Sequence, residues 1–190
     1  MRHRGIKGWI ACAVGVFAAL GAGGCAAPRV NTTMLTTADV VRMTDQMSAS
    51  LNASPEIASR TPDSPRWVFT MDRVANRTEH LLDDSEKWGI MARFRARLTA
   101  SNVARDRAVA FVLPAAEWER YAREFYDPAQ ARLRPTHALR AEFRSDTRSA
   151  IGSRADAYLC AFQLLDLETG RIVWEDAYET KYRVLRNSFD

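Results

Sequence analysis

The residue types that could carry catalysis or hold a metal ion are few and scattered along this chain. His80 and His137 are the histidines beyond residue 24, and they lie far apart with no cysteine or carboxylate at metal-ligand spacing. The remaining candidates are acidic residues that suit helix caps and solvated helix faces better than a catalytic pair: Asp83, Asp84, Glu117, Glu119 and Glu124. No nucleophile, phosphate-loop or dinucleotide motif occurs. We therefore expect no metal site, no cofactor and no enzymatic activity.

The residue whose setting indicates a covalent modification is Cys25. It follows the small residues Ala22-Gly-Gly24, and this arrangement resembles a bacterial lipobox. The resemblance implies cleavage before Cys25 and attachment of lipid to it, which holds a protein on a membrane without a transmembrane helix. Two alternatives remain open, namely ordinary secretion with an incidental Cys25 and an uncleaved anchor.

The first 24 residues have the pattern of a secretory signal peptide. Arg2, Arg4 and Lys7 precede an uncharged apolar stretch, residues 8–20, which is shorter than the ~20 residues that span a bilayer. Residues 25–36 are then the lipidated N-terminus and a short tether. The roughly 11 residues before the first expected helix reach at most ~36–40 Å when fully extended.

Charge and cysteine content change once the signal peptide is set aside. Its removal takes three of the 27 basic residues and none of the 23 acidic ones, which leaves a net charge near +1. Nothing in this balance favours a nucleic-acid partner. Cys160 becomes the one cysteine beyond the lipidated Cys25, so no intramolecular disulfide is available. Its apolar neighbours predict a buried, inert thiol.

The spacing of apolar residues predicts one small α/β (α+β) domain over residues 37–184, with a tail at 185–190. Helical spacing favours helices over residues 36–52 and 84–101 and after Pro114. Alternating or continuous apolar runs predict strands over 66–74, 108–113, 136–144, 157–167 and 171–183, with a polar connection around Gly152. The order αβαβαβββ indicates a mixed sheet with packed helices and a C-terminal antiparallel meander.

Several segments together resemble one family. They are Val74-Ala-Asn-Arg-Thr-Glu-His80, the strand Leu139-Arg-Ala-Glu-Phe143, and the hairpin Asp166-Leu-Glu-Thr-Gly-Arg-Ile-Val-Trp174. The resemblance is to the LpoB-like lipoprotein activators of penicillin-binding proteins, and it covers roughly residues 36–184. The wider fold group includes the N-terminal domain of TolB and the secretion lipoprotein CsgG.

The resemblance implies a small α/β domain with a regulatory role. Such a lipoprotein lies in the outer membrane, faces the periplasm and contacts a peptidoglycan synthase, a penicillin-binding protein whose activity it raises. Ala26 in place of Asp after the lipidated cysteine favours the outer membrane. A CsgG-like secretion or assembly component that oligomerises is the main alternative, and an envelope enzyme is a third.

Two groups of residues are candidates for contact with a partner. Asn76, Arg77 and Thr78 match the family segment and either shape a partner-facing loop or form a structural Asx-turn. Tyr178 and Tyr182 lie on the last expected strand, which could receive a partner if it forms a sheet edge. The alternative for both tyrosines is a place in the core.

Overall fold

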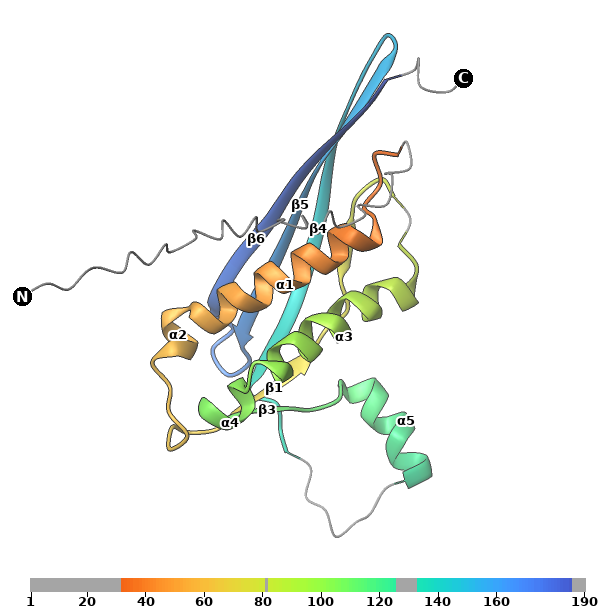
Figure 1. Ribbon diagram of the computed structural model, residues 1–190. Helices are drawn as coiled ribbons and strands as arrows, with labels where there is room; N and C mark the ends of the chain where they lie inside the picture. Colours follow the sequence, from red (N-terminus) through yellow and green to blue (C-terminus); the bar gives the residue numbers. More distant parts are fainter. Residues whose placement is uncertain (1–31, 81, 126–132, 186–190) are drawn as a thin grey trace, which may run out of the picture. The chain divides into compact units, whose positions relative to one another are not determined.

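The computed structural model describes residues 32–80, 82–125 and 133–185 (Figure 1). By its internal contacts the chain separates into residues 1–30 and residues 31–190, and the architecture below concerns the second unit alone. The expected signal peptide, Cys25 and most of the C-terminal tail lie outside the described residues. None of the helices in the described ranges is long and apolar enough to cross a membrane.

A six-stranded mixed sheet forms the centre of the domain, with strand order β3-β1-β4-β5-β6 and with β2 paired to β4. Its strands are β1 (Trp67–Met71), β2 (Ala75–Arg77), β3 (Val109–Phe111), β4 (His137–Ala150), β5 (Ser153–Asp166) and β6 (Ile172–Leu185). β1 runs parallel to β3 and β4, whereas β4, β5 and β6 are antiparallel. The predicted mixed sheet and C-terminal meander are therefore confirmed.

The described helices are α1 (Thr37–Ala53), α2 (Pro55–Ala58), α3 (Asp84–Ala100), α4 (Val103–Asp106) and α5 (Ala115–Phe125). Thr36 and Asp83 begin α1 and α3 as N-caps, and each forms a capping box with the acidic residue three positions on. The predicted order αβαβαβββ holds for the long elements. The short helices α2 and α4 were not predicted.

The core lies between one face of the sheet and the helices α1 and α3, which cover that face (Figure 1). Met43, Met47 and Leu51 of α1 and Phe94 of α3 are almost completely buried. The sheet contributes alternate residues of its central strands to the same core: Leu139, Ala141, Phe143, Tyr158, Cys160, Phe162 and Leu164. This period of two leaves the intervening residues of the strands on the opposite face.

Two local predictions were wrong. The polar connection around Gly152 is instead the continuation of β4 and β5, which pair as far as Ala150 and Ser153. Both strands run beyond the helices here, so their side chains lose the apolar alternation that a half-buried strand shows. Residues 75–77, which lie outside the predicted strands, form β2, which pairs with β4 rather than extending β1.

Candidate functional site

The second face of β4, β5 and β6 lies opposite the face that packs against α1 and α3. We call it the open sheet face. The pairing register brings one row of side chains from each strand onto it. β4 contributes Arg140, Glu142, Arg144, Asp146 and Arg148; β5 contributes Ala155, Ala157, Leu159, Ala161 and Gln163; β6 contributes Glu175, Ala177, Glu179, Lys181 and Arg183.

The open sheet face has an apolar centre between two charged borders. Its central strand presents four small or apolar side chains, of which Leu159 is 37% exposed. In register, Leu159 lies between Arg144 of β4 and Glu179 of β6. Arg144 is held by Glu142, with Nη2 2.6 Å from Oε1. An apolar centre with a polar rim is the composition of a protein-binding surface.

The segment Asn76–Thr78 forms a turn closed by its own side chains. Asn76 Oδ1 accepts hydrogen bonds from the Thr78 backbone N–H (3.1 Å) and from its hydroxyl (2.8 Å), and Asn76 Nδ2 donates to the His80 carbonyl oxygen (2.7 Å). Arg77 between them is exposed. The structure thus gives Asn76 and Thr78 a local role, and Arg77 is the member of this triplet that a partner can reach.

Tyr178 and Tyr182 lie on the helix side of the edge strand β6. The Tyr182 hydroxyl donates to Asp39 of α1, and its side chain is buried, whereas Tyr178 is partly buried against the core. Burial raises the pKa of Asp39, but hydrogen bonds from Tyr182, Thr36 and Arg42 outweigh it and hold that pKa below its usual value. β6 is the sheet edge that the sequence suggested, and Tyr182 joins it to α1 from within the domain.

A buried polar cluster, which the sequence reasoning missed, lies where the chain enters the domain. Thr33 donates its hydroxyl to Asp156 of β5, whose side chain is 0% exposed. Arg154 Nε donates to both carboxylate oxygens at 3.1 Å, and His80 Nε2 lies 3.4 Å from Oδ2. Burial raises the pKa of Asp156, yet the bonds from Thr33 and Arg154 keep it below its usual value. The cluster fastens the N-terminal segment to the sheet.

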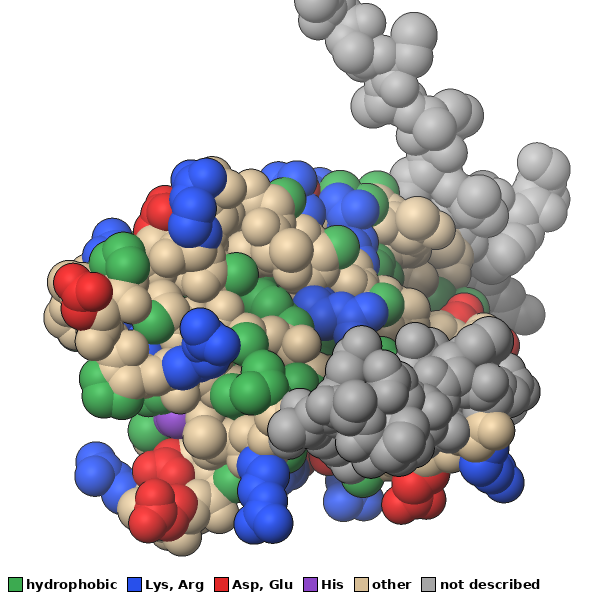
Figure 2. Space-filling view, turned by 90° about the horizontal axis from the view of Figure 1, so that it is seen from below, with side chains coloured by type: hydrophobic (Ala, Val, Ile, Leu, Met, Phe, Trp, Pro, Cys, Tyr) green, Lys and Arg blue, Asp and Glu red, His purple; other side chains and the backbone are tan. Residues whose placement is uncertain are grey.

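Two arginines of α3 form ion pairs with α1, and a third lines a surface cavity. Arg93 and Arg97 both reach Asp45 of α1, at 3.2 and 2.8 Å, and so join the two helices. Arg95 lines an apolar cavity of about 270 Å³ with Trp88 and Leu113, between α3 and the start of α5. Figure 2 shows hydrophobic side chains with Lys and Arg among them at this end of the domain. The cavity offers no group for chemistry beyond ionic and apolar contact.

The described residues contain no group of three or more His, Cys, Asp or Glu side chains that could hold a metal ion. Cys160 is a free thiol in the core, and burial raises its pKa to about 12. A thiol in this setting is inert, because the reactive thiolate is suppressed.

Comparisons with known proteins point to one family. The sequence model of the family described as "Peptidoglycan-synthase activator LpoB" matches residues 39–180. A comparison with curated proteins gave no match.

Solved structures with a similar chain include two LpoB C-terminal domains. That from Escherichia coli is 16% identical, covering 75% of this chain and 98% of its own with a TM-score of 0.45. That from Salmonella enterica is 14% identical, with the same coverage and a TM-score of 0.43. The NMR structure of E. coli LpoB is 14% identical over 95% of this chain and 84% of its own, with a TM-score of 0.41. Since these scores are modest, the family match carries the assignment.

Proposed function

Because the chain belongs to the LpoB family, we propose that it binds and activates a penicillin-binding protein that synthesises peptidoglycan. The family is one of synthase activators, which makes a regulatory role and a synthase partner the starting point. The observation that carries the proposal is the family match over residues 39–180, which spans nearly all of the helices and strands described above.

The proposal also covers the location of the protein in the cell. Residues 1–24 act as a signal peptide, Cys25 receives the lipid, and Ala26 directs the mature protein to the outer membrane, with the domain in the periplasm. The lipobox-like residues before Cys25 and the basic, apolar N-terminus support this. A role in peptidoglycan synthesis is consistent with a location in the cell envelope.

We assign to the synthase the part of the open sheet face that runs from Arg140 and Glu175 to Asp146 and Lys181, which leaves out Arg148 and Arg183 at the end near the β4–β5 turn. Its centre is apolar around Leu159, and its rim carries both signs of charge, so a partner can bury the centre and pair with the rim. The helix side of the same strands is unavailable, because α1 and α3 cover it. The candidate Arg77 lies beside this face, since β2 pairs Arg77 with Arg144.

The test is stimulation of a purified synthase from the same organism, measured as glycan polymerisation against activator concentration. Leu159→Glu places a charge at the apolar centre, and we expect it to raise the half-maximal concentration at least about tenfold, as loss of a central contact does. Leu167→Glu is the matched control, because Leu167 is also exposed, at 47%, but lies in the β5–β6 turn.

Three results would count against parts of the proposal. Failure of the unaltered protein to bind or stimulate any synthase of the organism would refute the activator role. Equal potency of Leu159→Glu and the unaltered protein would remove the open sheet face as the docking surface. A mature protein whose mass shows no acyl chains on Cys25 would refute the lipid anchor.

A further inference from the structure

The turn between β4 and β5 carries a large hydrophobic side chain, Ile151, that does not pack against the rest of the domain. Ile151 has a relative exposure of 105%, whereas the other exposed large hydrophobic side chains of the described residues lie between 36% and 48%. Gly152 beside it has φ +76°, so the left-handed position of the turn is occupied by glycine and places no demand on residue 151. Turns favour Gly, Asn, Asp, Ser and Pro, so the conformation of this turn does not explain an exposed isoleucine at position 151.

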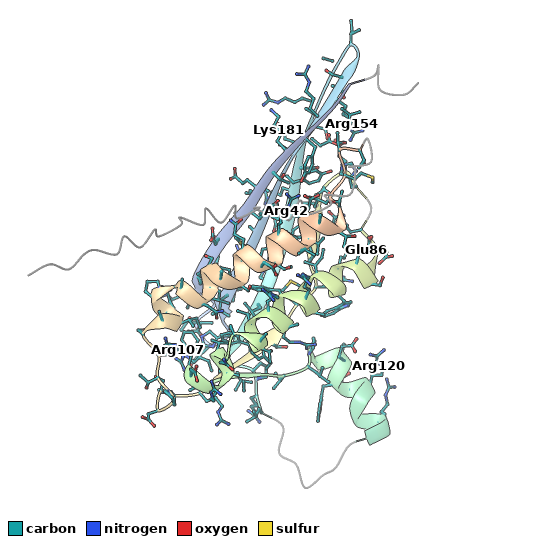
Figure 3. The ribbon with its side chains drawn as sticks, in the orientation of Figure 1. Arg42, Glu86, Arg107, Arg120, Arg154 and Lys181 are labelled. Carbon is teal, nitrogen blue, oxygen red and sulfur yellow. The ribbon has the colours of Figure 1, made fainter. Side chains whose placement is uncertain are left out.

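The strands next to this turn carry basic charge. Residues 148–155 and 182–185 include Arg148, Arg154 and Arg183 and contain no acidic residue. The Arg148 and Arg154 side chains are 81% and 45% exposed, and they reach back to Asp146 and Asp156. Figure 3 shows Arg154 and Lys181 on the part of the sheet that projects beyond the helices. We call Ile151 and these three arginines the hairpin tip.

The tether joins the domain close to the hairpin tip. Thr33 is fastened to Asp156, which pairs in register with Thr147, a few residues from the turn. Next to Thr33, the Met34 side chain is 48% exposed. Thr33 lies only eight positions after Cys25, and a fully extended chain spans at most ~28 Å over eight residue steps. A lipid on Cys25 therefore keeps this end of the domain near the membrane.

From these three observations we infer that the hairpin tip rests on the membrane, with Ile151 in the interfacial region and the arginines against anionic lipid headgroups. The inference rests on the proposed lipid anchor at Cys25. A single apolar residue with a few cations binds bilayers weakly by itself, but the short tether supplies a high local concentration of membrane. The partner surface is thus the anionic leaflet to which the protein is anchored.

The test uses the full lipidated protein in vesicles, with a fluorophore sensitive to its surroundings on Ile151→Cys. Cys160 does not compete for the label, because it is buried in the core. We expect a blue-shifted emission in phosphatidylethanolamine–phosphatidylglycerol vesicles and a water-like emission in phosphatidylcholine vesicles. The matched control is Leu167→Cys in the β5–β6 turn, which should stay water-like in both.

Replacing the arginines with uncharged residues tests the electrostatic contribution to the membrane contact. Each basic residue at an anionic surface changes the contact equilibrium about fivefold, so Arg148→Gln with Arg183→Gln should weaken it about 25-fold. Raising the salt to 1 M should act in the same direction, because the Debye length shortens from about 8 to about 3 Å.

The outcomes separate this inference from the lipid anchor. Protein that floats with anionic vesicles while the probe at position 151 stays water-like would overturn the membrane contact and leave the anchor intact. Protein that does not float would overturn the anchor, and the inference with it. A blue shift that grows with protein density on neutral vesicles would show contact between copies of the chain and would also overturn the inference.

Discussion

The bond between Thr33 and Asp156 sets where the tether ends, so its removal is a sharp test of the structure. Thr33→Val keeps the shape of the side chain but takes away the hydroxyl donor. Asp156 is fully buried and would keep Arg154 as its donor while one oxygen loses a partner. Hydrogen bonds to charged groups contribute about 1.5–3 kcal/mol, so we expect the free energy of unfolding to fall by about that amount.

The decrease in the free energy of unfolding has an upper limit. If residues 32–35 detach from the sheet, water can reach Asp156 and replace the lost hydrogen bond. Urea unfolding followed by tryptophan fluorescence measures the change, and Thr99→Val is the control. The Thr99 hydroxyl is exposed and donates within α3 to the Arg95 carbonyl oxygen, so the control should change stability by less than about 0.5 kcal/mol. Equal stability of Thr33→Val and the control would refute the reasoning.

The same variant has a defined pH dependence. The pKa of Asp156 is lower in the folded protein than its ordinary value of 3.8, so its contribution is present above that pH and is lost as the pH falls through the folded pKa. Thr33→Val removes one cause of the lowering. The difference in stability between the two proteins should therefore be full at neutral pH and shrink below about pH 4.

Three further predictions concern the core and its titratable groups. The Cys160 thiol should react with a disulfide reagent only after unfolding, and fast reaction in the native protein would contradict its burial. Burial lowers the pKa of His137 from 6.5, so stability should fall as the pH drops below 6.5; His137→Gln should remove that part of a pH titration of unfolding. Phe94→Ala should cost about 3–5 kcal/mol in urea unfolding, against less than about 0.5 kcal/mol for the exposed Leu167→Ala.

The sequence was a good guide wherever burial imposes a period. Met43, Met47 and Leu51 recur at helical spacing because α1 buries one side, and the alternation from Tyr158 to Leu164 follows from one covered sheet face. The hydroxyl of Thr36 marks the start of α1 by local chemistry alone. These signals carried the fold class.

The sequence was a poor guide where contacts join distant segments. The end of β4 and the start of β5 project beyond the helices, and polar side chains there concealed these parts of the two predicted strands. Nothing near Thr33 in the sequence indicates that Asp156, 123 residues away, accepts its hydroxyl. The open sheet face was missed for the same reason, since its three rows come together only through strand register.

The length of the sheet bears on how a short tether can serve an activator. Each strand from β4 to β6 has 14 residues, which at ~3.3 Å per residue extends ~46 Å, whereas most strands have ~3–10 residues. With Ile151 on the membrane, an upright domain carries the β5–β6 turn and the open sheet face well away from the bilayer. The rigid sheet then supplies reach that a linker would otherwise provide.

This orientation is measurable as an energy-transfer distance between a donor on Leu167→Cys and an acceptor lipid at the vesicle surface. We expect a separation of roughly 40 Å for an upright domain, from the strand length above. A donor on Ile151→Cys is the control and should lie within about 10 Å of the headgroups if the tip inserts at the interface. A short distance at both positions would mean that the domain lies flat on the bilayer and would refute the upright orientation.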